Sequence, residues 1–195
     1  MHPIRRAPVT AASTADVAAE HPPPDTWSIV EVPWSDPRAD DLRAAMDVEM
    51  SARYHDRLDA FDEDARLAAQ EALTVDPADV LVTVLALDGQ GAPVGHAALR
   101  DLAGEFEVKR VYVAPAARGR GASRALMSAL EDIAIARGAR RLILQTGDRQ
   151  PDAVALYEHI GYTRIPVFAP YLPIDFSICL AKDLTRRTAG RTVIA

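Results

Sequence analysis

The sequence predicts a mixed α/β fold built on a mostly antiparallel central sheet flanked by helices. Three apolar, β-branched runs lie between residues 81 and 113 and are separated by short turns, as in consecutive antiparallel strands. A glycine turn, an amphipathic helix and another apolar run follow between residues 119 and 147. A crossover of this kind brings two strands together in parallel, so the sheet is expected to be mixed.

One strand and two helices are expected ahead of the hairpins. Apolar and polar residues alternate over residues 27–32, which indicates a strand. A helix is expected from Pro37, because proline fits the first helical turn and Ser35 or Asp36 can cap it. Its apolar side chains recur at helical spacing, at Leu42, Met46 and Met50. A second helix is expected over residues 61–73, where acidic residues near the start favour the helix dipole.

Three strands should follow as two hairpins. They are expected at residues 81–87, 93–102 and 106–113. The Asp-Gly-Gln-Gly sequence at 88–91 is a turn that joins the first two of them.

Two further helices and three strands complete the predicted sheet. The helix after the glycine turn has an apolar stripe and should end at Gly138. Three polar residues of that helix should face away from the stripe: Arg124, Glu131 and Asp132. A strand at 141–147 comes next, followed by a helix with Pro151 in its first turn. The last two strands are expected near 163–168 and 176–181.

Composition excludes several classes of protein. Apolar residues make up 49 % of the chain, which is typical of a globular domain. The formal net charge of −6 argues against a nucleic-acid partner, and no apolar run reaches the roughly 20 residues of a membrane span. We expect one folded domain at 26–184, between a disordered tail at 1–25 and a flexible tail at 185–195.

The cysteine and histidine content favours a cytoplasmic protein without a metal. The single cysteine, Cys179, cannot form an intrachain disulfide, and its alternation with apolar residues indicates a packing role. The five histidines have no metal-ligand spacing. His96 lies inside a predicted strand, so a structural role is expected for it.

The segment 111–123 is the strongest functional signal. An apolar strand runs into a glycine-rich turn that opens an amphipathic helix, and unpaired N–H groups at a helix start attract phosphate. Gly119 and Gly121 let the backbone approach an anion closely, and flanking arginines add positive charge. The spacing is not that of a dinucleotide fingerprint, because Arg124 replaces its third glycine, and the Lys-Ser or Lys-Thr of a Walker A loop is missing.

The Arg-Gly-x-Gly-x-Ser turn resembles the acyl-CoA pyrophosphate loop of the GNAT N-acetyltransferase superfamily. The resemblance extends over roughly residues 80–183, through the strand 141–147 to Leu-Tyr-Glu-x-x-Gly-Tyr at the end of the next helix. It implies a GNAT fold whose sheet splays between its fourth and fifth strands, where acetyl-CoA lies as the co-substrate.

The resemblance also implies how acetyl-CoA is held. The main chain of Val111 and Val113 would pair with the pantetheine arm like an added strand. The pyrophosphate would be bound by the glycine turn, at Arg118, Gly119, Arg120, Gly121, Ala122 and Ser123. Many members have an asparagine seven residues before the helix tyrosine, and Gln150 stands there in this chain. Its amide is retained with a longer reach.

Two residues are predicted to be catalytic. By the resemblance, Tyr157 corresponds to the tyrosine that GNAT enzymes commonly use to protonate the leaving CoA thiolate. The alternative is a packing role for its ring. By the resemblance, Glu107 corresponds to a glutamate that several GNAT members use as general base. The alternative is a solvated or Lys109-paired carboxylate. Glu105 is a weaker candidate for the base. Strand alternation places Glu107 on the face of Val111 and Val113 unless a β-bulge intervenes. Candidates for the acceptor pocket are Tyr54, His55, Phe168 and Tyr171.

The resemblance implies direct transfer of acetyl to a primary amine, and the leading hypothesis is the amine of a small molecule. Acetylation of protein lysine or N-terminal amines is the first alternative. A non-catalytic acyl-CoA-binding regulatory module is the second. The chain is expected to act as a monomer or a homodimer.

Overall fold

The computed structural model describes residues 27–185. The two predicted tails lie outside the described residues, except for Thr185. No helix of the described part is long and apolar enough to cross a membrane.

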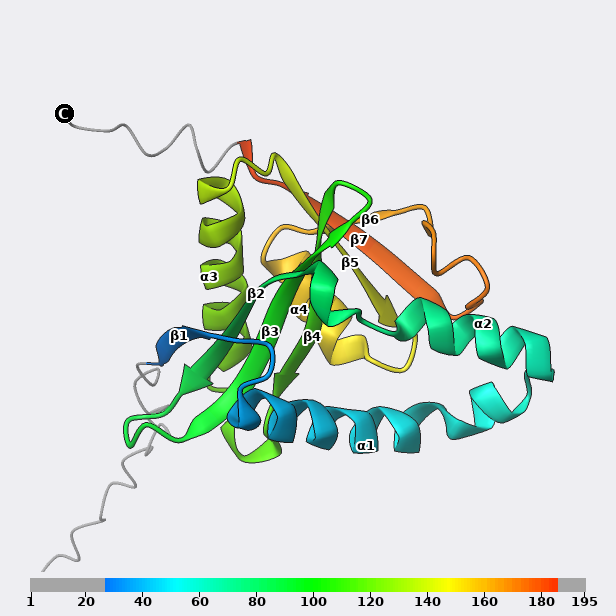
Figure 1. Cartoon of the computed structure of the whole chain (residues 1–195), viewed down its shortest axis with the longest axis horizontal. Coiled ribbons are helices and arrows are strands. Elements are labelled where there is room, and N and C mark those ends of the chain that lie inside the picture. The colour runs from blue at the N-terminus through cyan, green and yellow to red at the C-terminus, as the bar shows by residue number, and fades with distance from the viewer. Residues whose placement is uncertain (1–26, 186–195) are drawn as a thin grey trace, which may run out of the picture.

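A single twisted sheet organises the described residues (Figure 1). Its seven strands lie in the order β1-β2-β3-β4-β5-β7-β6. Their bounds are Ser28–Val32 (β1), Val80–Leu87 (β2), Pro93–Leu102 (β3), Glu105–Val113 (β4), Arg141–Gly147 (β5), Thr163–Ile165 (β6) and Ser177–Asp183 (β7). All neighbouring strands are antiparallel except β4 and β5, so the predicted mixed sheet is confirmed.

The parallel contact between β4 and β5 is short. Only Glu107 with Ile143 and Val108 with Leu144 are in register, and the two strands then separate. Beyond Val108, β4 therefore has no strand partner on its β5 side. This is the splay expected between the fourth and fifth strands.

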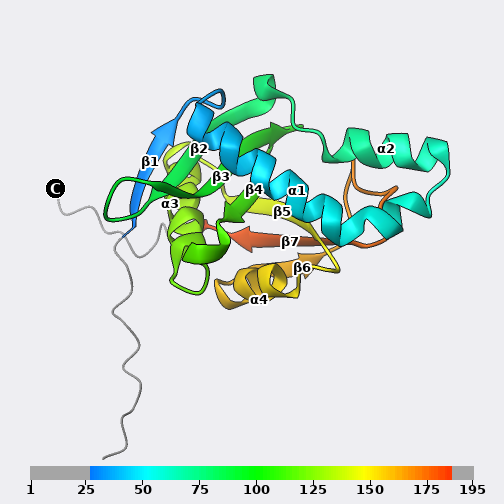
Figure 2. The ribbon, with the colours of Figure 1, turned by 90° about the horizontal axis from the view of Figure 1, so that it is seen from below.

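Helices cover both faces of the sheet (Figure 2). The helices are Pro37–Asp59 (α1), Glu63–Leu73 (α2), Ala122–Ala136 (α3) and Pro151–His159 (α4). Residues of α3 and α4 share the largest hydrophobic core with one face of β2 to β5. Residues of α1 pack on the opposite face, and α2 packs beyond it against the β6–β7 connection. Two short 3-10 helices, Pro77–Asp79 and Pro115–Ala117, were not predicted.

Local chemistry sets where the helices begin and end. The Asp36 side chain accepts the N–H of Arg38 at the start of α1, and Asp62 caps α2 in the same way through Ala65. Gly138 follows the end of α3 with φ +84°, as the predicted helix stop requires.

Glu131 corrects one prediction. It was expected to face away from the apolar stripe of α3, yet its side chain is buried. The ammonium of Lys182 on β7 donates to both carboxylate oxygens, at 2.7 and 2.8 Å. Burial of a carboxylate is tolerated here because a charged partner from the sheet meets it.

Candidate functional site

The opening between β4 and β5 holds a cavity of about 430 Å³. Its walls come from α1, the end of β4, the glycine turn, the start of α3 and the helix α4. Eight of the predicted site residues line it: Val111, Val113, Arg118, Gly119, Ala122, Ser123, Gln150 and Tyr157. Segments far apart in the sequence thus contribute to one site.

The glycine turn has the backbone that the sequence motif requires. Gly119 and Gly121 have φ values of +74° and +90°, in the left-handed region that favours glycine. A Cβ at either position would meet nothing within 4 Å, so backbone conformation, and not crowding, makes glycine suitable. Gly121 is the N-cap of α3 and provides no side-chain cap. The helix start at Ala122 and Ser123 lines the cavity, and its first N–H groups have no side-chain cap, unlike those of α1 and α2.

A β-bulge in β4 decides which of its residues share a face of the sheet. Arg110 has φ +56°, and the register between β3 and β4 shifts at this point. Val111 and Val113 consequently join Val108 on the face that packs against α3. Glu107 lies on the other face, so the strand alternation expected without a bulge does not apply.

Tyr157 on α4 is buried and lines the cavity. Burial raises the pKa of its phenol well above the ordinary value, so it remains protonated at neutral pH. Its ring packs against that of Tyr162 with centroids 5.9 Å apart. Within residues 27–185 the hydroxyl has no hydrogen-bond partner, and it is free to donate to a ligand.

Arg118 does not point its charge into open space. Its Nε donates to the carbonyl of Val113 at 2.9 Å, and its Nη2 donates to a carboxylate oxygen of Glu49 on α1 at 2.5 Å. Arg53 pairs with the other oxygen of Glu49 at 2.7 Å. The two arginines hold the pKa of Glu49 below its usual range. Neither Glu49 nor Arg53 was predicted as a site residue, although both lie at helical spacing from Met46 and Met50.

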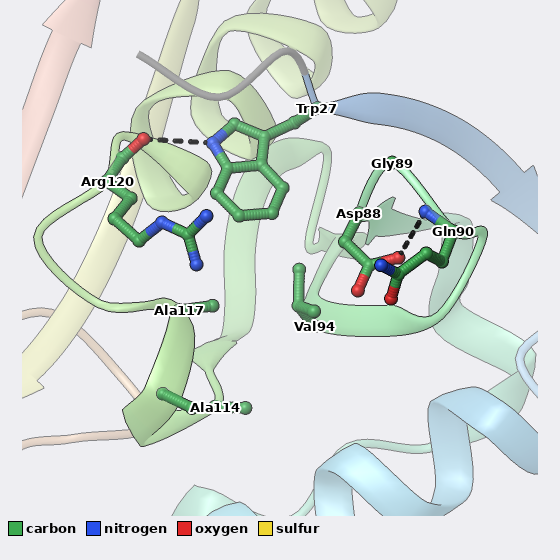
Figure 3. A pocket seen from close by; sticks show the side chains of 9 residues that line it. Trp27, Asp88, Gly89, Gln90, Val94, Ala114, Ala117 and Arg120 are labelled. Atoms are coloured by element: carbon green, nitrogen blue, oxygen red, sulfur yellow. Dashed lines mark hydrogen bonds between the residues drawn. The ribbon is translucent and has the colours of Figure 1, made fainter. Parts of the chain in front are cut away.

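Arg120 lies apart from the other predicted cofactor residues. It lines a second hollow of about 420 Å³ with Trp27 and the β2–β3 turn (Figure 3). Its guanidinium lies 5.5 Å from the centroid of the Trp27 ring, and its carbonyl accepts the indole N–H at 3.0 Å. The left-handed residues on either side of Arg120 turn its side chain away from the main cavity, and Gly121 lines neither hollow.

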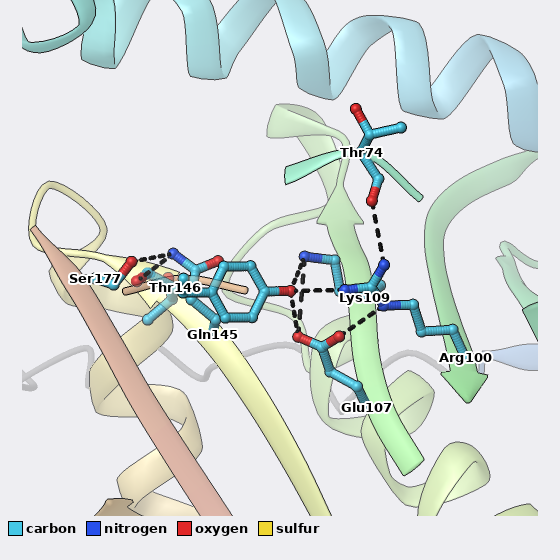
Figure 4. Close-up of polar contacts among 8 residues, drawn as sticks. Thr74, Arg100, Glu107, Lys109, Gln145, Thr146 and Ser177 are labelled. Atoms are coloured by element: carbon cyan, nitrogen blue, oxygen red, sulfur yellow. Dashed lines mark hydrogen bonds and ion pairs between the residues drawn. The ribbon is translucent and has the colours of Figure 1, made fainter. Parts of the chain in front are cut away.

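Glu107 is sealed inside a polar cluster (Figure 4). One carboxylate oxygen accepts from Arg100 Nε at 2.7 Å, and the other accepts from the Tyr171 hydroxyl at 2.5 Å. Lys109 Nζ lies 4.0 Å from the second oxygen and donates to Tyr171 at 2.8 Å. Burial lowers the pKa of Lys109 to about 8. Glu107 does not line the cavity, so its role as general base stays a prediction.

The residues predicted for the acceptor pocket do not line the cavity. Tyr54, Phe168 and Tyr171 belong to a packed aromatic cluster, and His55 is exposed on α1. The Tyr54 hydroxyl accepts the N–H of Arg149 at 2.9 Å and lies so close to Gly147 that a Cβ there would be 2.2 Å away. The cavity wall on this side is instead made by α1, through Met46, Glu49, Met50 and Arg53.

Glu105 is partly exposed and pairs with Arg141 at 2.7 Å. Glu105 is the first residue of β4 and does not line the cavity. Among residues 27–185, no three His, Cys, Asp or Glu side chains are grouped as metal ligands.

Comparison with known proteins identifies the family. The model of the acetyltransferase (GNAT) family matches residues 39–162. The chain belongs to this family. Its mixed, splayed sheet is the GNAT fold, and the protein is an acetyl-CoA-dependent N-acetyltransferase.

Individual relatives agree with this assignment. An IAA acetyltransferase of Azospirillum brasilense is 36 % identical over 106 residues, which cover 54 % of this chain and 69 % of the relative. A Klebsiella pneumoniae structure described as a candidate acyl-CoA N-acyltransferase is 31 % identical with a TM-score of 0.64, over 81 % of this chain and 97 % of that one. A GNAT acetyltransferase of Elizabethkingia anophelis, solved with acetyl-CoA bound, has a TM-score of 0.56 at 15 % identity, over 80 % and 97 %. The last similarity concerns the fold alone.

Proposed function

We propose that the chain transfers acetyl from acetyl-CoA directly to a primary amine of a small molecule. One observation carries the proposal. The glycine turn, the unpaired edge of β4, Gln150 and Tyr157 meet in a single cavity. An acetyl-CoA molecule needs an anion site, a strand edge and a proton donor in that spatial order.

The cavity supplies each binding contact from a different element. The start of α3, with the backbone of Gly119 and Ser123, would hold the diphosphate through N–H groups and the positive end of the helix. The main chain of Val111 and Val113 would pair with the amides of the pantetheine arm, since β5 has already diverged there. The side-chain amide of Gln150, at the N-terminus of α4, would reach the same arm.

Tyr157 would then assist departure of the thiol. The amine nitrogen attacks the thioester carbonyl carbon and forms the C–N bond, and the C–S bond breaks as the tetrahedral intermediate collapses. The sulfur leaves as a thiolate, and the protonated phenol of Tyr157 donates to it. The incoming amine loses one proton, to Glu107 as the predicted base or to solvent, and one proton returns to Tyr157 before the next turnover. Glu107→Gln tests the role of Glu107. No covalent enzyme intermediate is needed.

The position of α1 favours a small acceptor over a protein. The helix crosses the face of the sheet (Figure 2), and ion pairs fasten it on both sides of the β4–β5 opening. Arg118 holds it at the glycine turn, and Asp148 of the β5–α4 connection pairs with Arg57 at 2.5 Å. A cavity with this fixed helix along one wall admits a compact amine more readily than a folded protein surface. A relative named IAA acetyltransferase is consistent with this choice.

The setting of the reaction forms part of the proposal. We infer a cytoplasmic enzyme that works as a monomer or a homodimer without a metal ion, a nucleic acid or a membrane. The single, buried Cys179 suits a reducing compartment.

The test uses labelled acetyl-CoA and an unfractionated extract of metabolites and proteins. Purified protein is incubated with both, and mass spectrometry follows the label, with Tyr157→Phe as the control. Label in one or a few amine metabolites supports the proposal and identifies the acceptor. Label on defined lysines or N-termini would replace it with protein acetylation. Binding of acetyl-CoA without enzyme-dependent label in either fraction would favour a regulatory module.

A further inference from the structure

A carboxylate in the cofactor cavity needs an explanation. Acetyl-CoA carries several negative charges, yet Glu49 of α1 lines the cavity that would receive them. Its side chain is about one-fifth exposed, and its pKa is held below the usual range by Arg118 and Arg53. Glu49 is therefore ionised at neutral pH and can compete with a diphosphate for a nearby cation.

The Glu49 partner is the first arginine of the glycine turn. Arg118 donates through Nη2 to Glu49 and through Nε to the carbonyl of Val113. Both acceptors belong to the proposed cofactor site. The Glu49 carboxylate lines the cavity that would hold the phosphates, and the Val113 carbonyl belongs to the strand edge predicted to pair with pantetheine. Arg118 therefore fills contacts that the ligand would otherwise use. Its side chain is 40 % exposed, so it has room to change partners.

We propose that Glu49 is a positioning residue that competes with the cofactor phosphates for Arg118. This inference rests on the proposed function of the cavity. When the cofactor enters, a phosphate replaces Glu49 as the partner of Arg118, and Glu49 keeps its pair with Arg53. Glu49 thus weakens binding of acetyl-CoA and of the product CoA, and it links occupancy of the phosphate site to the cavity-facing side of α1.

The test is the binding of CoA to Glu49→Gln, measured by titration calorimetry. Gln is isosteric and removes the competing charge, so we expect CoA to bind about fivefold more tightly. Pantetheine, which lacks the phosphates, should bind with unchanged affinity. The matched control is Asp47→Asn, which removes the same charge from the same helix but outside the cavity lining. It should leave both affinities as they are.

A double variant locates the effect at Arg118. In an Arg118→Gln background, Glu49→Gln should produce no further gain for CoA, because the contested partner is gone. Equal or weaker CoA binding by Glu49→Gln, with an unchanged thermal unfolding midpoint, would overturn the competition while leaving the proposed function intact. A gain that also appears with pantetheine would overturn it as well. Failure of the unaltered protein to bind CoA at all would overturn the proposed function itself.

Discussion

The two ends of β4 treat charge in opposite ways. Near its start, Glu107 and Lys109 are buried with Arg100 and Tyr171, and each polar group has a partner within the cluster. Beside its end, the cavity contains Glu49, whose partners Arg53 and Arg118 are partly exposed. Sealed charges cannot change partners without a large cost, whereas cavity charges can.

A single residue separates these two environments. The bulge at Arg110 lies between them: Glu107 and Lys109 before it belong to the sealed cluster, and Val111 and Val113 after it line the cavity. Substitutions in the sealed cluster should therefore change stability, and substitutions around the cavity should change binding or turnover.

The largest effect is expected from Glu107→Gln. Removing this charge leaves the buried guanidinium of Arg100 uncompensated, and the free energy of unfolding should fall by about 3 kcal/mol. Urea unfolding measures it. The matched control is Glu105→Gln on the same strand, where loss of the exposed pair with Arg141 should cost about 0.5 kcal/mol or less.

The same variant decides the role of Glu107 in catalysis. We expect the acidic limb of the pH–rate profile to persist in Glu107→Gln, since the carboxylate does not line the cavity. Loss of that limb would assign Glu107 as the general base and would break the division between the two ends of β4.

A pH-dependent loss of stability is expected next, from His96 on β3. Its Nδ1–H donates to the carbonyl of Arg110 at 2.8 Å, and burial lowers its pKa from 6.5 to about 4. Between these values the unfolded chain binds a proton that the folded chain does not, so stability falls as the pH drops through this window. From pH 7 to 5 the loss should be about 2 kcal/mol.

Urea unfolding at both pH values measures the His96 contribution. His96→Gln should remove this part of the pH dependence, and the same change at the exposed His55 should not. Equal pH dependence in His96→Gln and the unaltered protein would show that the histidine is not buried neutral.

Local signals were enough to predict most of the fold. The strands at 93–102 and 141–147 have the predicted bounds, because each is an apolar run closed by turn residues. The strand predicted at 163–168 ends at Ile165, where Pro166 cannot donate to the sheet. The ion-pair partner of the buried Glu131 could not be predicted, because Lys182 is distant in sequence and reaches it only through the folded sheet.

The candidate site was likewise predictable where local motifs define it and not where it depends on tertiary structure. The glycine turn and Tyr157 belong to contiguous motifs, so sequence alone brought them out. The side of β4 that Glu107 occupies depends on the bulge at Arg110, and an arginine gives no local signal for a left-handed backbone. The contribution of Glu49 depends on how α1 crosses the sheet, which is a property of the tertiary structure.

Within the cavity, Tyr157→Phe should affect turnover but not acetyl-CoA binding. Loss of the phenolic proton should lower turnover by about tenfold or more, with acetyl-CoA affinity little changed. Steady-state kinetics with the acceptor that the labelling experiment finds, and calorimetry with CoA, measure the two effects. Tyr162→Phe is the matched control, because its ring packs on Tyr157 but lies outside the cavity lining. Unchanged turnover in Tyr157→Phe would remove this residue from the mechanism.

The smallest effect is expected at the start of α3, where stability and binding should move in opposite directions. Ser123→Asp places a negative charge in the first turn of an uncapped helix, which should stabilise the fold by about 0.5 kcal/mol. The same charge occupies the anion site, so CoA affinity should fall by about fivefold. Ser123→Ala separates loss of the hydroxyl from gain of charge and should change CoA affinity less. If Ser123→Asp weakened CoA binding no more than Ser123→Ala, the start of α3 would not be the phosphate site. The cavity at the end of β4 would then lack the anion site that the proposed function requires.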